Sequence, residues 1–390
     1  METGFQLPED IKMLQTWARD FVRREILPLE LNMDPEAVDI SQEDWDRLSK
    51  VTKDAGMWCL GVPEEYGGGG LSCFAMTVLG EELSQHRNGL YNPGYRLLGS
   101  PPPPVIFEGT KEQIEKYALP TVRNADHTFY AITEPSGGSD AAALQTTAAE
   151  KDGTYFLNGS KMFITNASVA STLVVFATED RSKGYKGISA FLVQKDSPGL
   201  TINPMHGKLG MRSSTTDEVV FQDTPVSSNN LLGERGRGFN HAMEILTQSR
   251  IIIAAQSVGI GQAALEAAVR FAQIRETFGN PIAQHQAIQF MLADMAVGVH
   301  SSRVATMNSA SLMDAGQPFL QEASIAKLMA SEMCIDVANK AIQIHGGAGY
   351  FQEAGVERIF RDARVTTIYE GTSEVQRLLI ARKLMEQYPV

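Results

Sequence analysis

The sequence contains only three cysteines, Cys59, Cys73 and Cys334, and they lie far apart with no CxxC pair. This spacing indicates a reducing compartment and no structural metal site. Positive charge is also scarce: 34 Lys and Arg against 46 Asp and Glu give a net charge of −12, which argues against a nucleic-acid partner. No apolar run approaches the length of a membrane span, and residues 1–20 lack a signal or Arg-rich transit pattern. We therefore expect a soluble intracellular protein with no membrane partner.

The remaining composition is that of an ordinary globular protein, with 43% hydrophobic and 21% charged residues. A chain of 390 residues is long enough for two or three domains with a large core. Residues 1–127 are patterned as helices. Apolar residues from Ile11 to Val22 keep a 3–4 spacing, Ser41 begins a second helix, and Thr110-x-x-Gln113 has the spacing of a capping box.

The pattern changes at Thr128, and residues 128–236 predict a compact all-β domain of ordinary size. TLVVFA, ISAFLVQ and DEVVF are short β-rich runs, and Asp152-Gly153 and Asn158-Gly159 are predicted hairpin turns. Residues 237–390 return to a helical period, with stretches long enough for a helix bundle. The order of the three predicted domains is therefore α, then β, then α.

The last predicted helix begins just after the tetrad YEGT at 369–372. Thr372 or Ser373 can cap this helix, and Ser373-x-x-Gln376 has capping-box spacing. Glu370 therefore lies on a tight turn freed by a glycine, from which a carboxylate can project into a cavity. The alternative is a solvated carboxylate that favours the helix dipole. The rest of the helix predicts docking through one apolar stripe, formed by Val375, Leu378, Leu379 and Leu384.

Two segments of the β region are candidates for ligand binding. YAITEPSGGSD at 130–140 ends a strand in a Gly-rich bend with hydroxyls and free backbone N–H groups, which suits an anionic or heteroaromatic ligand. NGSKMFITN at 158–166 places Phe163 and Thr165 on one side of a strand. Taken alone, Phe163 is better explained as a core aromatic.

A third segment resembles a dinucleotide-binding loop, because Gly259-Ile-Gly261-Gln-Ala-Ala264 follows a β-branched run. However, residues 249–274 have continuous helical character, and the following RETFGNPIAQHQ is not a second buried strand. We therefore reject a nicotinamide site and expect the small residues to permit close helix packing.

Taken together and in this order, six segments resemble the acyl-CoA dehydrogenase family across nearly the whole chain. They are ITEPSGGSD, NGSKMFITN, KLGMRSSTTDEVVF, RETFGNPIAQHQAIQFMLADMA, QIHGGAGY and RDARVTTIYEGTSEVQR. The resemblance implies an α+β multi-domain fold with an N-terminal helical domain, a central β-barrel or sandwich and a C-terminal four-helix bundle. It also implies FAD, a homotetramer that completes each FAD site from a neighbouring subunit, an acyl-CoA substrate and an electron-transferring flavoprotein as acceptor. The expected location is the bacterial cytoplasm, or the mitochondrial matrix if a transit peptide has been removed.

The resemblance also implies roles for individual residues, with Glu370 as the catalytic base. Residues expected to contact FAD are Tyr130, Ile132, Thr133, Gly138, Ser139, Phe163, Ile164, Thr165, Arg275, Thr277, Phe278, His285, Gln286, Gln343, Gly346, Gly347, Thr372 and Glu374. Residues expected to contact substrate are Ser139, Thr247, Arg250, Gly371 and Arg96. For Arg250, a buried structural ion pair is the alternative.

The implied chemistry explains why these residue types are needed. Removal of a proton α to a thioester leaves an enolate, whose oxygen needs fixed hydrogen-bond donors. Some relatives carry the base on the helix near Arg250, but here that position is Ser249, which cannot serve. An acyl-CoA oxidase, a flavin monooxygenase and a non-catalytic flavoprotein are the competing functions. The resemblance implies that Arg96 stands where medium-chain relatives have the floor of the acyl pocket. There it either reaches solvent, pairs internally or meets a polar acyl terminus.

Overall fold

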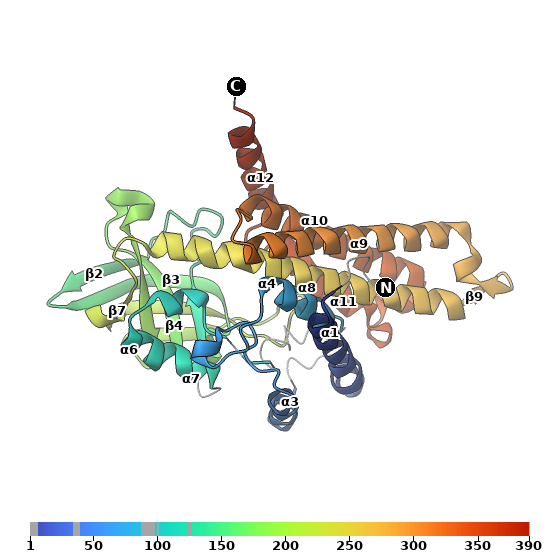
Figure 1. Cartoon of the computed structure of the whole chain (residues 1–390), viewed down its shortest axis with the longest axis horizontal. Helices are drawn as coiled ribbons and strands as arrows, with labels where there is room; N and C mark the ends of the chain where they lie inside the picture. Colours follow the sequence, from blue (N-terminus) through green and yellow to red (C-terminus); the bar gives the residue numbers. More distant parts are fainter. Residues whose placement is uncertain (1–6, 34–39, 87–97, 100, 124–126, 390) are drawn as a thin grey trace.

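The computed structural model describes residues 7–33, 40–86, 98–99, 101–123 and 127–389. Figure 1 shows a helical N-terminal part, a sheet at one end of the molecule, and long C-terminal helices that extend away from it. The predicted order of α, β and α domains is confirmed. Helix α8 (Gly238–Ile274) runs along the molecule and links the sheet to the far end of the helical region.

The N-terminal helices form where the sequence places caps and apolar faces. Ser41 caps α3 by accepting a hydrogen bond from the Asp44 N–H, and the predicted capping box at Thr110 and Gln113 is present. Both caps satisfy N–H groups that would otherwise lack partners at a helix start. The elements are α1 (Glu9–Phe21), a π-helical turn (Val22–Ile26), α2 (Leu27–Asn32), α3 (Gln42–Asp54), α4 (Cys73–Leu83), a 3₁₀ turn (Pro104–Glu108), α6 (Lys111–Gln113), a second π-helical turn (Ile114–Ala118) and α7 (Leu119–Val122).

The β domain is a mixed sheet in the order β6-β7-β3-β2-β4-β5-β8, with β1 paired to β4 in parallel. Strand β4 is buried along its whole length and serves two cores: Leu173 and Val175 face the sheet interior, while Val174 and Phe176 face the N-terminal helices and α8. The bounds are β1 (Thr128–Ala131), β2 (Thr147–Lys151), β3 (Thr154–Thr165), β4 (Thr172–Thr178), β5 (Ile188–Gln194), β6 (Leu200–Pro204), β7 (Thr216–Ser227) and β8 (Leu231–Leu232).

Of the two predicted hairpin turns, one is confirmed and one is wrong. Asp152-Gly153 connects β2 to β3, with φ of 51° and 75°. Asn158-Gly159 instead lies inside β3, at a bulge in its pairing with β7. A Cβ on Gly159 would come within 2.7 Å of the Thr146 Cα, so this glycine permits close strand approach rather than a turn.

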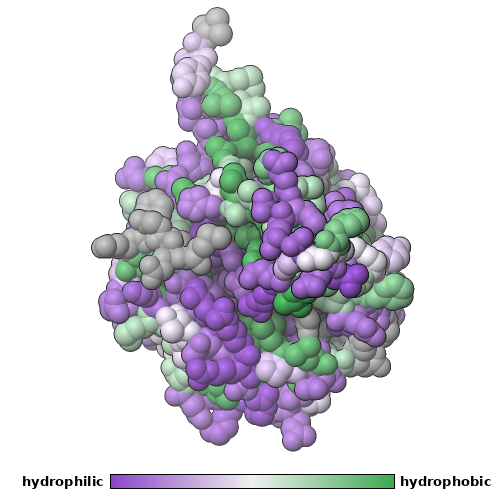
Figure 2. All heavy atoms as spheres, turned by 90° about the vertical axis from the view of Figure 1, so that its right-hand side faces the viewer, coloured by the Kyte–Doolittle hydropathy of each residue, from purple (hydrophilic) through white to green (hydrophobic). Residues whose placement is uncertain are grey.

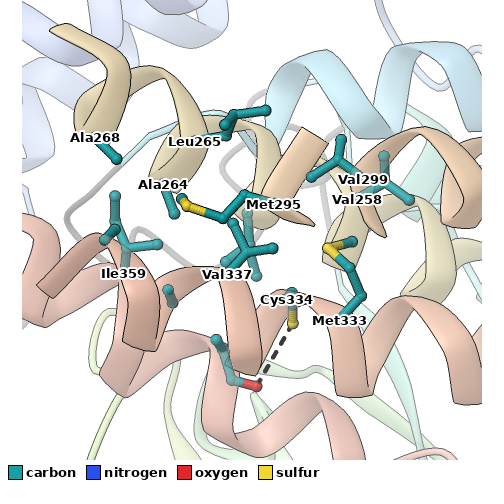
Figure 3. Close-up of a cluster of buried hydrophobic side chains, with 14 of the residues drawn as sticks. Val258, Ala264, Leu265, Ala268, Met295, Val299, Met333, Cys334, Val337 and Ile359 are labelled. Carbon is teal, nitrogen blue, oxygen red and sulfur yellow. Dashed lines mark hydrogen bonds between the residues drawn. The ribbon is translucent and has the colours of Figure 1, made fainter. Parts of the chain in front are cut away.

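The C-terminal domain is built on α8, α9 (Gln286–Asp314) and α10 (Leu320–His345), followed by α11 (Val356–Ala363) and α12 (Ser373–Gln387). A two-stranded hairpin of β9 (Glu276–Thr277) and β10 (Asn280–Pro281) joins α8 to α9. Figure 3 shows the core of this domain, where Val258 and Leu265 of α8 lie among Met295, Met333 and Val337 of the neighbouring helices.

Helix α8 confirms the rejection of a dinucleotide loop, since both glycines of the GxGxxA sequence lie inside one continuous helix. A Cβ on Gly259 would lie 2.2 Å from the Glu81 carbonyl oxygen of α4. On Gly261 it would lie 2.8 Å from the Met333 sulfur of α10. These glycines therefore allow three helices to approach closely, as predicted.

Gly259→Ala is expected to destabilise the protein by about 2–3 kcal/mol, because the new methyl group meets α4 backbone that cannot move independently. Gly80→Ala is the matched control at the same helix pair: its Cβ would lie 3.7 Å from Ala255, an ordinary contact. We expect the control to be neutral or stabilising by up to about 1 kcal/mol. Urea unfolding measures both variants, and equal effects would contradict the prediction.

The last helix does not dock as predicted. Its buried residues are Ser373 and Gln376, whereas Leu378 is 62% exposed and Leu384 is 43% exposed. In Figure 1, α12 projects from the body of the molecule. The apolar stripe read from the sequence therefore lies largely on the surface of a single chain.

The expectation that no apolar run is long enough for a membrane span is also wrong for α8. Among the described residues this helix is long and apolar enough to span a membrane, by length and composition alone. An apolar 18-residue stretch of it is 78% buried inside the protein, which is the position of a core helix. Alanines, glycines and polar residues lie between the large apolar residues of this helix, so the sequence shows no continuous apolar run of that length.

Candidate functional site

Glu370 lies on a tight turn between α11 and α12, with a positive φ of 53° that is unusual for a residue other than glycine. Gly371 follows with φ of 87°. Thr372 caps α12 by accepting a hydrogen bond from the Val375 N–H. Gln376 forms no capping box but donates to the carbonyl oxygens of Glu370 and Gly371 at 3.3 and 2.9 Å. These hydrogen bonds hold the loop that carries Glu370 against the first helical turn of α12.

Two hydroxyl groups from different domains converge on the Glu370 carboxylate. The Tyr130 hydroxyl of β1 donates to Oε1 at 2.6 Å, and the Ser249 hydroxyl of α8 donates to Oε2 at 2.6 Å. Because both carboxylate oxygens accept hydrogen bonds from the protein, these contacts do not support the alternative that Glu370 is a solvated loop carboxylate. They also show that Ser249, which cannot act as a base itself, lies against the residue predicted to be one.

Two cations lie near this carboxylate. Arg250 is 4% exposed and donates to the Thr247 hydroxyl at 3.0 Å, while its Nε has no hydrogen-bond partner. Burial lowers the pKa of Arg250, and the nearby Glu370 opposes this shift. Within the part of the chain that the structure describes, Arg250 has no carboxylate at ion-pair distance, so the alternative of a structural ion pair finds no support. The second cation is Lys327, whose Nζ donates to the Gly371 carbonyl at 2.8 Å.

The two predicted ligand segments of the β domain lie side by side. The Met162 N–H donates to the Thr133 carbonyl at 2.9 Å, and fully buried Lys161 donates to the Ile132 carbonyl at 3.1 Å and to Glu134 at 2.8 Å. Burial lowers the pKa of Lys161 to about 8, against the opposing effect of Glu134. This buried pair joins the 130–140 segment to β3.

Phe163 is 60% exposed and has a positive φ of 59°, so it is not the core aromatic that it resembles in isolation. Its neighbour Ile164 is 4% exposed and belongs to the core, which leaves only its backbone for a ligand. The positive φ of Phe163 falls at a register shift between β3 and β7. A bulky residue at positive φ is uncommon, and strained backbone positions of this kind cluster at functional sites.

The other predicted cofactor residues gather at the far end of the helical domain. Phe278 is 96% exposed with φ of 54°, and the Thr277 hydroxyl lies 2.9 Å from the His285 ring. At the same end, Phe271 stacks on His345 with 4.2 Å between ring centroids, a pair that the sequence did not predict. Figure 2 views the molecule from this end and shows apolar patches among polar residues. Further predicted residues of this end are Arg275, Gln286, Gln343, Gly346 and Gly347, all of them exposed.

These two groups of residues are far apart within one chain. Ser249 and Arg275 are separated by 26 residues (275 − 249) along α8, which corresponds to roughly 39 Å at 1.5 Å per residue. Among the remaining predicted residues, Gly138, Ser139 and Glu374 are exposed and Thr372 is half-buried. Arg96 lies outside the described residues.

The structure shows one buried hydrogen bond near Glu370 that the sequence did not predict. The Tyr369 hydroxyl donates to Gln256 Oε1 at 2.6 Å, and Gln256 is 4% exposed in the middle of α8. Gln256 follows Ser249 by seven residues, which places both on one face of the helix. That spacing, together with a polar residue in an apolar run, was the signal available in the sequence.

One further cluster is of a kind that can hold a metal. His241 lies with its Nδ1 3.4 Å from Glu108 and 3.7 Å from Glu244. Both carboxylates are about half exposed, and these distances are those of ion pairs. The sequence expectation of no metal stays an expectation.

Comparison with known proteins gives concordant results. Family models of the acyl-CoA dehydrogenase N-terminal, middle and C-terminal domains match residues 8–125, 130–224 and 236–385. The rat mitochondrial short-chain specific acyl-CoA dehydrogenase is 42% identical, with 98% of this chain and 92% of the relative covered. Subunit CarC of the caffeyl-CoA reductase–Etf complex of Acetobacterium woodii is 39% identical, with 97% and 99% covered. The structure of butyryl-CoA dehydrogenase from Megasphaera elsdenii is 36% identical with a TM-score of 0.89, covering 98% of this chain and 99% of that one.

Proposed function

Because the chain belongs to the acyl-CoA dehydrogenase family of FAD-dependent oxidoreductases, we propose that it oxidises the 2,3 bond of an acyl-CoA thioester with Glu370 as the base. The observation that carries this proposal is the environment of Glu370. Its carboxylate is held on a strained turn by two hydroxyl groups and faces two cations. Strained backbone conformations of this kind cluster at functional sites, which supports a catalytic role for Glu370.

The residues present fit the family's cofactor, FAD. Exposed Phe163 offers an aromatic face beside the Gly-rich 130–140 segment, and Gly137 has open space where a Cβ would stand. At the far end of the helical domain, Gly346 and Gly347 are likewise open, which permits a ligand to approach the backbone closely. When bound, FAD supplies the acceptor for the hydride from the substrate β-carbon.

The wide separation of these two groups supports a homo-oligomer. One extended dinucleotide does not span roughly 39 Å between the Glu370 region and the far end of α8. The distal residues of one chain therefore serve the FAD of a neighbouring chain. The exposed apolar residues of α12, including Leu378 and Leu384, are available for contacts between copies. We propose the homotetramer implied by the sequence resemblance.

In the proposed reaction Glu370 receives the proton from the α-carbon, and the electron pair of that C–H bond moves onto the thioester as an enolate. Each carboxylate oxygen accepts one hydroxyl hydrogen bond in the free protein and keeps a second lone pair, so Glu370 can receive the α-proton while Tyr130 and Ser249 hold its side chain in place. Arg250, anchored on Thr247, keeps a positive charge beside the reacting groups. Fixed charge and donors of this kind stabilise an enolate without reorganising during the reaction.

We propose a short acyl chain for the substrate. Gln256 follows Ser249 by about two helical turns, or about 10 Å along α8, and it accepts a hydrogen bond from Tyr369. We propose that the acyl chain runs along α8 in this direction, so that a longer chain would meet this polar pair. Burying a methylene chain against these groups is unfavourable unless their hydrogen bond is kept. The rat relative is named as short-chain specific, which agrees with the proposal of a short acyl chain.

An electron-transferring flavoprotein is the proposed acceptor, in line with the Etf complex of the Acetobacterium relative. That relative is named a reductase, and the same residues catalyse either direction of a reversible reaction. An oxidase or monooxygenase on this fold differs in the reaction of the reduced enzyme with O₂. Slow reoxidation by O₂ with fast reoxidation by an electron-transferring flavoprotein supports the proposal, and the reverse result contradicts it.

The purified protein is expected to be yellow and to bleach under anaerobic conditions when butyryl-CoA is added. The measurement is the visible absorbance of the bound flavin during a titration with butyryl-, octanoyl- and glutaryl-CoA. Butyryl-CoA is expected to act fastest. A protein that cannot be reconstituted with FAD, or that no acyl-CoA bleaches, would overturn the proposed function.

A further inference from the structure

Lys327 of α10 is 0% exposed, and within the described part of the chain the only hydrogen bond of its side chain is to the turn that carries Glu370. Its Nζ donates to the Gly371 carbonyl at 2.8 Å, and Gln376 donates to the same oxygen at 2.9 Å. A fully buried lysine is rare unless a partner or a function requires it. A neutral carbonyl is a weak partner for a buried ammonium group, so its placement needs another reason.

The charged and titratable groups that interact with Lys327 lie on its own helix, on α8, on the Glu370 turn and on α12. They are Glu370 on the turn, Arg250 on α8, Glu332 and Cys334 on α10, and Glu374 on α12. Burial lowers the pKa of Lys327 to about 8, and Glu370 is the group that most strongly opposes this shift. Lys327 is therefore close enough to Glu370 for their charges to interact.

The proposed reaction conserves one negative charge in this site. Before proton transfer the charge is on the Glu370 carboxylate; afterwards Glu370 is neutral and the charge is on the substrate enolate. A cation fixed behind the turn faces the charge in both states. By Coulombic attraction, the cation therefore stabilises the pair of Glu370 and substrate when the two together carry one negative charge, relative to the state in which both are protonated. The effect is strong because the site is poorly hydrated.

We propose that Lys327 is a positioning residue for this reaction: its ammonium group fixes the turn behind Glu370 and supplies a buried positive charge facing the pair formed by Glu370 and the substrate. The inference rests on the proposed function, because it needs Glu370 to be the base. Hydrogen bonding through the Gly371 carbonyl gives the geometry, and burial makes the charge effective.

The test uses acetoacetyl-CoA bound to the FAD-loaded enzyme. The acidic α-carbon of this 3-oxoacyl thioester ionises to an enolate, but its β-carbon carries no hydride to transfer. The absorbance of the enolate is measured as a function of pH. It gives a macroscopic pKa that belongs to the ligand and Glu370 together, because their ionisations are coupled. Lys327→Gln keeps an N–H donor for Gly371 and removes the charge, Lys327→Met removes both, and Lys327→Arg keeps the charge.

We expect Lys327→Gln and Lys327→Met to raise this pKa by about one unit, a tenfold fall in the ionisation constant, with Lys327→Arg much closer to wild type. The matched control is Lys340→Met on the same helix, which removes a lysine paired with Asp336 away from the site and leaves the pKa unchanged. Thermal unfolding and flavin content are measured for each variant. A purely structural role lowers the unfolding temperature without moving the ligand pKa.

A wild-type pKa in Lys327→Gln overturns the electrostatic role, and Lys327→Gln gives the decisive comparison where Lys327→Met fails to fold. The failure of this inference is distinguishable from that of the proposed function. If butyryl-CoA does not bleach the wild-type enzyme, the proposed function fails. If it does, and the ligand pKa is insensitive to Lys327, only the present inference fails.

Discussion

Glu370→Gln is expected to slow reduction of the bound flavin by butyryl-CoA by about three orders of magnitude or more, while the protein still folds and binds FAD. An amide cannot take the α-proton, and general-base catalysis and positioning are lost together. The fold is expected to survive because glutamine still accepts one hydroxyl hydrogen bond and can donate to the other. Those hydroxyls are on Tyr130 and Ser249, each 2.6 Å from the native carboxylate.

Stopped-flow absorbance of the flavin measures this effect, with the unfolding temperature and flavin content as checks on structure. Glu386→Gln is the control: it removes a carboxylate near the end of α12 whose contact is an exposed ion pair with Lys383. We expect the control to reduce flavin at the wild-type rate. Retention of more than about a tenth of wild-type turnover by Glu370→Gln would show that another residue is the base.

The turn that carries Glu370 could be predicted because its causes are local. A glycine permits the reversal, and a threonine caps the helix that follows, so both signals lie within three residues. The rejection of the GxGxxA segment succeeded for a similar reason: the helical period continues through the glycines. Domain order followed from the change of period at Thr128 and its return before α8.

What could not be predicted depends on contacts between distant segments. Lys327 reaches the Gly371 carbonyl across 44 residues of sequence, and Lys161 reaches Glu134 across 27. A helical period shows that an apolar face exists but not what covers it, so the sequence predicts docking of the α12 stripe without showing that much of it is exposed on a single chain. Asn158-Gly159 fits a turn equally well until the close approach of Thr146 is known.

Gln256→Ala is expected to extend the range of substrates toward longer acyl chains. The wild-type Gln256 side chain is buried beside α8 and accepts the Tyr369 hydroxyl at 2.6 Å. Its removal frees space about 10 Å along the helix from Ser249, the residue that marks the position of the catalytic carboxylate. Alanine keeps the helix intact, since it has the best helix propensity.

The size of the effect follows from the added apolar surface. Octanoyl-CoA has about four more methylenes than butyryl-CoA, and burial of each is worth about 0.8 kcal/mol, so full accommodation amounts to about 3 kcal/mol or roughly a hundredfold in kcat/KM. Loss of the hydrogen bond from the Tyr369 hydroxyl to Gln256 opposes part of this gain. We therefore expect octanoyl-CoA to improve by between about tenfold and a hundredfold relative to butyryl-CoA.

Steady-state kcat/KM values for butyryl-, hexanoyl- and octanoyl-CoA measure this shift, with Gln273→Ala as the control. Gln273 is an exposed glutamine near the end of the same helix, and its side chain donates to the Val269 carbonyl at 3.2 Å. The control is expected to keep the wild-type order of substrates. An unchanged order in Gln256→Ala would place the end of the acyl pocket elsewhere, and would leave the Tyr369–Gln256 hydrogen bond as a support for the Glu370 turn alone.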